Sequence, residues 1–96
     1  MGKLVRDKIP EIIKNNNKIP IFYVADTEEY YKALLNKLDE ELREFVESNN
    51  IEELADVAEI IDAILEYKNV SKKEFDSIKD KKAFERGKFN NRFILK

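Results

Sequence analysis

The chain has 96 residues, 43% of them hydrophobic and 40% charged, with two glycines, two prolines and a net charge of −2. This length fits one domain, 1–96, and the many charged helix formers with few chain breakers favour helices over a β-sandwich. Cysteine and histidine are both absent, which excludes disulfides, thiolate metal sites and every His-dependent catalytic mechanism. Any metal held by side chains must therefore be held by oxygen, as suits Mg²⁺, Mn²⁺ or Ca²⁺ rather than Zn²⁺.

Charge is segregated along the chain. Residues 1–18 carry a net +3, residues 27–66 carry thirteen acidic side chains against three basic ones, and residues 79–96 carry a net +5. An acidic centre between basic ends fits a fold that neutralises itself, and it equally fits a site for a complex of a cation with a polyphosphate. It argues against a nucleic-acid partner, since no reading motif accompanies the basic ends.

The sequence also bears on location. No apolar run approaches the roughly 18 residues of a membrane span. The opening MGKLVRDKIP lacks the apolar core of a signal peptide. We expect a cytoplasmic protein that does not engage a membrane.

The first half of the chain predicts a short helix, an extended segment and a long helix. Residues 6–14 form the short helix, which tolerates Pro10 only near its first turn. Residues 19–25, IPIFYVA, are β-branched and aromatic, which favours extended structure. Asp26 with Glu29 is a capping-box pattern, so a long helix should begin there and run to about residue 47.

Two further capping-box patterns divide the second half. Asn50 with Glu53 opens a helix to about residue 67, and Ser71 with Glu74 opens another that should stop near Gly87. The tail at 89–95 is expected to be extended and able to pair with 19–25. The predicted fold class is all-α, an antiparallel bundle of about four helices with two short extended segments.

Paired carboxylates border the apolar faces of the two central helices. On the long helix Glu41 sits at the edge of the apolar stripe, with Glu44 one turn further along and Glu40 pointing away. On the next helix Glu53 falls inside the apolar arc and Asp56 lies at its border. The stripe of the long helix comprises Tyr31, Leu35, Leu38, Leu42 and Phe45, with Leu34 beside it; the arc of the next comprises Leu54, Val57, Ala58, Ile61, Ile64 and Leu65, extended by Ile60.

These pairs have two interpretations. Acidic helix faces are usually solvated, and Glu53 has a local role open to it as the partner of Asn50. Against this, a buried carboxylate is costly unless it is paired or metal-bound, and four facing carboxylates repel one another without a cation. The residues alone leave a divalent metal site and a solvated acidic face about equally supported.

The same residues resemble a known family. EELRE at 40–44 followed by ELAD at 53–56 is similar to the EExxE…ExxD signature of the MazG-like all-α NTP pyrophosphohydrolase superfamily, to which phosphoribosyl-ATP pyrophosphohydrolase is related. Three further segments resemble one subgroup, the house-cleaning non-canonical NTP pyrophosphatases: KLVRDKIPEII at 3–13, EELADVAEIIDA at 52–63 and ERGKFNNRFIL at 85–95. The likeness runs through nearly the whole chain.

The resemblance implies Mg²⁺-dependent hydrolysis, with Mn²⁺ as a substitute, of a nucleoside triphosphate to a monophosphate and pyrophosphate. Its catalytic metal ligands are carried over to Glu41, Glu44, Glu53 and Asp56, with Glu40 a weaker candidate. Only eight residues separate Glu44 from Glu53, which requires a tight turn between the helices.

Basic residues at both ends are the candidates for binding the phosphates. They are Lys3, Arg6 and Lys8 at the start, and Arg86, Lys88 and Arg92 at the end. Arg6 and Arg86 are favoured because both lie in the resembling segments; the alternative is that each is a solvated surface charge. Five aromatic residues are able to stack on a base or, more simply, to pack in the core: Phe22, Tyr23, Tyr30, Tyr31 and Phe45.

Two rival functions remain. One is a non-catalytic helical dimerisation module of the same fold, and the other is the nucleic-acid binder that the acidic centre disfavours. In either case two helices with wide apolar faces bury little in so short a chain, so we expect at least a homodimer through the long helices.

Overall fold

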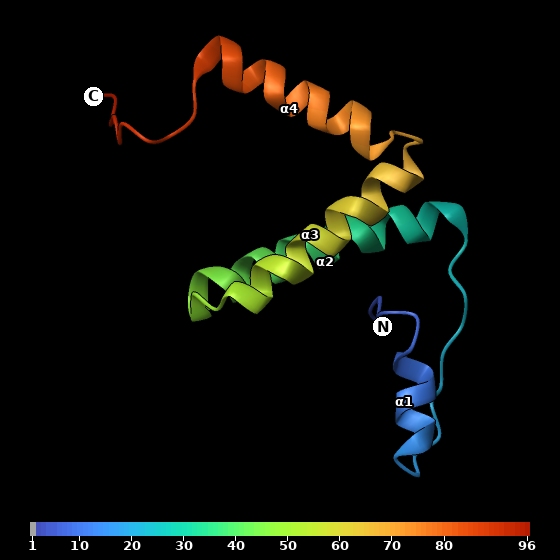
Figure 1. Ribbon diagram of the computed structural model, residues 1–96. Coiled ribbons are helices and arrows are strands. Elements are labelled where there is room, and N and C mark those ends of the chain that lie inside the picture. The colour runs from blue at the N-terminus through green and yellow to red at the C-terminus, as the bar shows by residue number, and fades with distance from the viewer. Residues whose placement is uncertain (1) are drawn as a thin grey trace. The chain divides into compact units, whose positions relative to one another are not determined.

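A computed structural model describes residues 2–96, and within them it contains four helices and no strand (Figure 1). The helices are α1 (Ile9–Asn15), α2 (Thr27–Ser48), α3 (Ile51–Tyr67) and α4 (Lys72–Arg86). The predicted all-α class is confirmed, and the three longer helices begin and end within a residue or so of their expected bounds. The first helix begins later than expected, at Ile9, with Pro10 in its first turn.

The chain divides into two compact units, Met1–Ile64 and Leu65–Lys96. The first unit contains α1, α2 and most of α3, and therefore all of the predicted metal ligands. The second contains α4 and the basic tail, and the boundary falls inside the continuous helix α3. The assignment of one functional domain to 1–96 stays a prediction.

Side-chain caps define where α2 and α4 begin. The Asp26 carboxylate accepts a hydrogen bond from the Glu29 amide at 2.8 Å, and the Ser71 hydroxyl accepts one from the Glu74 amide at 3.0 Å. Each bond satisfies an amide that the first helical turn would otherwise leave without a partner. Asn50 caps α3 slightly differently, because its side chain accepts from the Glu52 amide at 3.1 Å.

Asparagines close the turns after the first three helices. Asn17, Asn49 and Asn69 all have left-handed backbones, with φ of 61°, 56° and 58°. Asparagine tolerates this conformation better than other residues with a Cβ atom. At Asn49 the turn leaves only residues 49–50 between α2 and α3, so the two helices run back along each other as a hairpin (Figure 1). The tight turn required by the short spacing of the carboxylates is confirmed.

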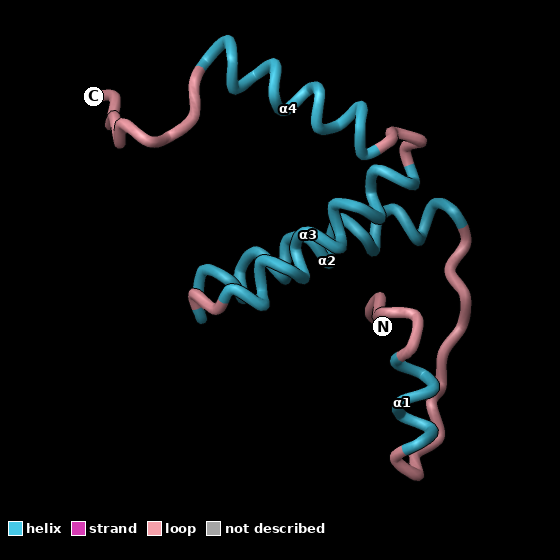
Figure 2. Tube along the Cα trace, in the orientation of Figure 1, coloured by secondary structure: helices cyan, strands magenta, loops and turns pink. Residues whose placement is uncertain are grey.

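Neither segment expected to be extended forms a strand. Residues 18–26 have no regular secondary structure and return from the end of α1 to the start of α2 (Figure 2). In the second unit, residues 89–92 form a turn in which the Arg92 amide donates to the Phe89 carbonyl at 3.1 Å. The apolar side chains that suggested a strand at 18–26, such as Ile21 and Val24, are exposed.

The apolar stripe of α2 is rotated relative to the prediction. Leu34, placed beside the stripe, is the most buried residue at 2% exposed, whereas Leu35 and Leu42 are 42% and 44% exposed. On α3 the buried residues are Val57 and Ile60, while Leu54 is exposed. The predicted stripe and arc included every large apolar residue on one side of each helix. Two helices can bury only the half of each apolar face that lies against the other helix. No helix among residues 2–96 is both long enough and apolar enough to cross a membrane.

The Ser71 cap provides a direct test of how α4 is held. Ser71→Ala removes the only side-chain acceptor for the Glu74 amide and should cost about 1 kcal/mol. Hydrogen exchange of the first-turn amides of α4 should accelerate correspondingly. Ser77→Ala is the matched control, because Ser77 is exposed in the middle of the same helix. Equal protection in both variants would contradict the capping role.

Candidate metal centre

The α2–α3 hairpin brings the predicted ligands together. Carboxylate oxygens of Glu41, Glu53 and Asp56 all lie within 4.8 Å of one another, and so do those of Glu40, Glu41 and Glu44. Glu41 belongs to both groups. We call these five residues the carboxylate cluster. It is formed because α2 presents an i, i+3 pair and α3 presents another across the hairpin.

Glu41 is the centre of the cluster and its most enclosed member. It is 7% exposed, although the sequence placed it only at the edge of the apolar stripe. Its Oε1 atom lies 3.5 Å from the Lys37 ammonium, but its Oε2 atom is buried and has no hydrogen-bond partner among residues 2–96. A buried acceptor without a partner costs about 1–3 kcal/mol. This oxygen therefore calls for a ligand that the protein itself does not supply.

The electrostatics of the cluster follow from burial and like charge. Burial raises the pKa of Glu41, and the closeness and negative charge of neighbouring Glu44 raise it further. Burial also raises the pKa of Glu53, assisted by the charge of Glu41. Glu40 behaves differently, since its hydrogen bond with Lys3 and the charge of Lys37 lower its pKa. At Glu41 and Glu53, burial and like charge thus outweigh the nearby positive charge, whereas at Glu40 the two lysines outweigh the effect of burial.

A divalent cation fits this donor set. The ligands available are carboxylate oxygens alone, as Mg²⁺ and Mn²⁺ prefer. Exposed acidic groups often gather without a metal, so proximity is not sufficient. The distinguishing observation is the enclosed Glu41 Oε2, which has no partner of its own and belongs to a group with Glu53 and Asp56.

Basic side chains from the N-terminal segment contact the cluster. Arg6 Nη2 lies 2.7 Å from Asp56 Oδ1, and Lys3 Nζ lies 3.2 Å from Glu40 Oε1. Because these contacts join residues 50 and 37 positions apart in the chain, they tie the start of the protein to both helices of the hairpin. Arg6, a predicted phosphate-binding residue, thus contacts the carboxylate cluster through Asp56, and its role in binding phosphate stays a prediction.

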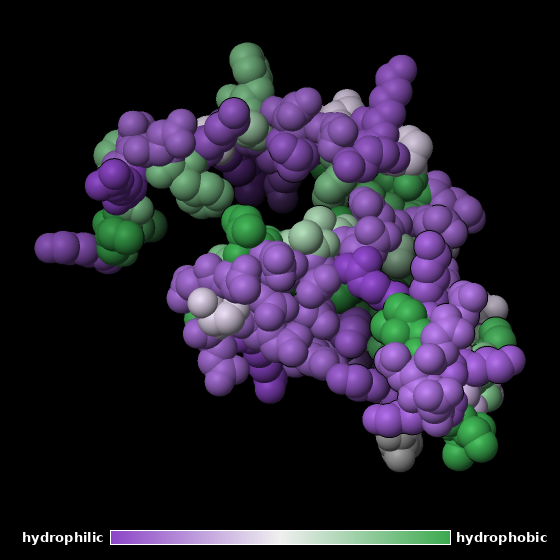
Figure 3. Space-filling view, turned by 60° about the horizontal axis from the view of Figure 1, so that its bottom comes forward, coloured by the Kyte–Doolittle hydropathy of each residue, from purple (hydrophilic) through white to green (hydrophobic). Residues whose placement is uncertain are grey.

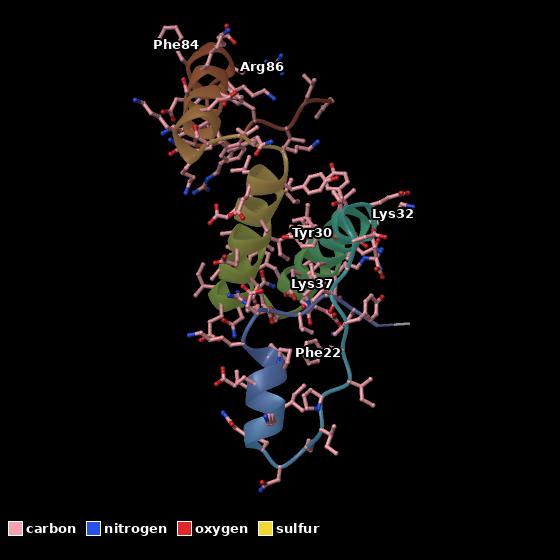
Figure 4. The ribbon with its side chains drawn as sticks, turned by 90° about the vertical axis from the view of Figure 1, so that its right-hand side faces the viewer. Phe22, Tyr30, Lys32, Lys37, Phe84 and Arg86 are labelled. Carbon is pink, nitrogen blue, oxygen red and sulfur yellow. The ribbon has the colours of Figure 1, made fainter. Side chains whose placement is uncertain are left out.

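Lys37 is a residue that the sequence reasoning missed. Its ammonium lies 3.5 Å from Glu41 Oε1 and 3.8 Å from Glu40 Oε1, and its side chain is 20% exposed. Figure 4 shows it on α2 beside the N-terminal segment. The signal available in the sequence was its spacing of four residues from Glu41, which puts both side chains on one helix face.

A pocket of about 760 Å³ opens beside the cluster within the first unit. Glu41 and Asp56 belong to its wall together with the cations Arg6, Lys8 and Lys37. Its apolar lining includes Leu34, Ile60 and Ile12, and the Tyr30 ring also lines it. Of the other aromatic candidates, Phe22 and Tyr23 are exposed, and the Tyr23 hydroxyl donates to Glu29.

The predicted basic residues of the C-terminal end lie in the second unit. Arg86 is the last residue of α4 and Lys88 follows Gly87, whose φ of 83° ends the helix. Arg92 has a left-handed backbone with φ of 58°. All three side chains are exposed, and their role in phosphate binding stays a prediction.

Comparison with known proteins leaves the family open. No family model matches the chain, and no solved structure matches it. An uncharacterized protein of Mycolicibacterium smegmatis is 46% identical over 44 residues, which are 46% of this chain and 45% of that protein. The chain thus matches less than half the length of this relative.

The raised pKa of Glu41 predicts how stability depends on pH without metal. A carboxyl group whose pKa is raised in the folded state supports folding below its ordinary pKa of about 4.3, and this support is lost as pH rises through the raised value. Glu41→Gln should therefore increase the free energy of unfolding at pH 7, by on the order of 1 kcal/mol, and leave it unchanged below pH 4. Urea denaturation at both pH values, with EDTA present, measures the difference.

Glu47→Gln is the control, because Glu47 is an exposed residue of the same helix and the substitution removes the same charge. A gain in stability equal to that of Glu41→Gln would show that only the net charge of α2 matters. A loss of stability in Glu41→Gln at pH 7 would show that the buried carboxylate is satisfied in the metal-free protein.

Proposed function

We propose that this protein is a Mg²⁺-dependent nucleoside triphosphate pyrophosphohydrolase, acting on canonical or non-canonical nucleotides in the cytoplasm. Its products are a nucleoside monophosphate and pyrophosphate. The observation that carries the proposal is the buried, unpartnered Glu41 Oε2 inside a carboxylate cluster that borders a pocket lined with cations. The resemblance of 3–13, 40–44, 53–56 and 85–95 to the MazG-like superfamily supports the same reading.

Glu41, Glu44, Glu53 and Asp56 would hold the Mg²⁺ ion, with Mn²⁺ able to replace it. When bound, the ion neutralises phosphate charge and makes a water easier to deprotonate. The hairpin holds these carboxylates in place before any ligand arrives. Because the chain has no histidine, a carboxylate oxygen of Glu41 or Glu44 accepts the proton of the attacking water.

The remaining phosphate charge requires cations from the chain itself. Arg6 and Lys8 line the pocket that contains Glu41, and a guanidinium offers two parallel hydrogen bonds to a phosphate. Arg86, Lys88 and Arg92, which belong to the second unit, stay predicted phosphate-binding residues. The apolar wall, with the Tyr30 ring, accommodates the nucleoside; a pocket of this size is within the range for small-molecule sites.

A second candidate function is a non-catalytic helical dimerisation module. The observation that favours it is the apolar surface left on the hairpin, where Leu35, Leu42 and Val46 follow one line on α2 and are all exposed. Ile51 and Leu54 extend it onto α3, and Figure 3 shows apolar patches reaching the surface among charged side chains. This module needs the apolar residues but gives no reason for an enclosed, unpartnered Glu41. A homodimer is compatible with both functions.

Pyrophosphate release from a panel of nucleoside triphosphates tests the activity. We expect turnover with Mg²⁺ or Mn²⁺, none with EDTA, and pyrophosphate rather than orthophosphate as the product. Glu41→Gln and Glu53→Gln should each lower turnover by on the order of 100-fold or more, as loss of a central electrostatic group does, while the helical circular dichroism stays intact. Glu47→Gln should retain full activity.

Folded protein without metal-dependent turnover on any nucleotide would favour the dimerisation module. Unfolding of Glu53→Gln, together with full activity of Glu41→Gln, would remove the ligand assignment.

The proposed homodimer has its own test. Leu42→Lys places a charge on the exposed apolar line of α2 and should convert the dimer to a monomer, as measured by light scattering at micromolar concentration. Arg43→Ala, one position away and paired only with Asp39 on the surface, should leave the dimer intact. A wild-type monomer at that concentration would contradict the proposal.

A further inference from the structure

Two cations of the chain contact carboxylates that are proposed to bind a metal ion. Lys37 faces Glu41 Oε1 at 3.5 Å, and Arg6 donates to Asp56 Oδ1 at 2.7 Å. They come from different places, one from the middle of α2 and one from the segment before α1. Glu41 and Asp56 belong to the same group of three carboxylates, so each of the two has one internal counter-charge.

Lys37 is less exposed than two other lysines that form ion pairs, Lys3 and Lys32. Its side chain is 20% exposed, whereas those of Lys3 and Lys32 are 68% and 73% exposed. A lysine side chain that is mostly covered gains from a nearby anion, because covering its charge without one is unfavourable. If Glu41 gave its charge to another cation, Lys37 would keep only the longer contact with Glu40 Oε1 at 3.8 Å, and an anion within reach of its side chain would replace the contact it lost.

That replacement has a place to bind. Lys37 and Arg6 both line the 760 Å³ pocket, as do their partners Glu41 and Asp56. Lysine and arginine side chains have several rotatable bonds, so either cation can turn from its carboxylate to a ligand in the pocket. A ligand carrying several negative oxygens close together matches two cations that are held near each other.

We propose that Lys37 and Arg6 are exchangeable counter-cations, which neutralise Glu41 and Asp56 in the metal-free protein and turn to the anionic oxygens of a polyphosphate once a divalent cation is bound. The claim that the two cations turn to a polyphosphate rests on the proposed function. The claim that they compete with a bound divalent cation for the carboxylates does not. Lys37 thereby becomes an anion-binding residue beyond those predicted from the sequence.

The exchange couples the two binding events. Without a polyphosphate, a divalent ion must compete with Lys37 and Arg6 for the carboxylates, which weakens its binding. With a polyphosphate present, both side chains have a second partner, and the competition disappears. By reciprocity, the bound ion strengthens polyphosphate binding by the same factor. In the metal-free protein, Glu41 and Asp56 each keep one cation, and Lys37 and Arg6 each keep a carboxylate.

Mn²⁺ binding to the full chain, measured by titration calorimetry without nucleotide, tests the competition. Lys37→Gln and Arg6→Gln should each tighten Mn²⁺ binding roughly fivefold or more, within the usual range of coupling between sites. Lys32→Gln is the control, because this substitution removes the same charge at a lysine that pairs with Glu28 in the first turn of α2. It should leave Mn²⁺ affinity nearly unchanged. Lys37→Met, which preserves the length of the buried stem, gives a second variant if Lys37→Gln is poorly folded.

The anion-binding half is tested with pyrophosphate supplied as its Mn²⁺ complex. The Lys37 and Arg6 variants should bind this complex roughly tenfold more weakly than wild type, even though they bind Mn²⁺ alone more tightly. This reversal of sign is the signature of the exchange. If a side chain only positioned a carboxylate, replacing it would weaken the binding of Mn²⁺ alone as well as the binding of the complex.

The outcomes separate the inference from the proposed function. Unchanged or weakened Mn²⁺ affinity in both variants overturns the exchange, whatever the protein hydrolyses. Tightened Mn²⁺ binding with no pyrophosphate release from any nucleotide supports the counter-cation role and contradicts the proposed function. Absence of Mn²⁺ binding in every form overturns both.

Discussion

Repulsion among carboxylates held together by a two-residue turn is the constraint on which the rest of the first unit depends. Asn49 and Asn50 fold α3 back along α2, and that geometry fixes Glu41 against Glu53 and Asp56. Packing around Leu34 stabilises the hairpin, while the charges within it oppose each other. The N-terminal segment then contributes by bringing Arg6 and Lys3 to the cluster, so its position follows from the charge it offsets.

Much of this arrangement was predictable because it depends on local chemistry. Asp26 and Ser71 mark helix starts through side-chain bonds to nearby amides, and such bonds need only the neighbouring sequence. The i, i+3 spacing of Glu41 with Glu44, and of Glu53 with Asp56, indicated shared helix faces. The proximity of Glu41 to Glu53 and Asp56 then followed from the short turn.

The sequence could not predict which half of each helix face is covered by the other helix. The apolar pattern of α2 predicted Leu35 and Leu42 in the core, but Leu34 is the buried residue. The line along which two helices touch depends on the tertiary packing and cannot be read from one helix. The same rotation carries Glu41 inward and makes it the enclosed member of the cluster. Lys37 was missed for a related reason: a lysine four residues from a glutamate is common on solvated helices, and only its low exposure sets it apart.

The turn at residues 49–50 also limits which changes in length the protein can tolerate. An added residue there must either lengthen the turn or join one of the two helices, and a helix extended by one residue turns its side chains by about 100°. Glu53 and Asp56 would then leave the face that meets Glu41. Residues 18–26, which have no regular structure, can accept insertions without altering any helical register. Over evolutionary time, insertions and deletions should therefore accumulate before α2 and be nearly absent between α2 and α3.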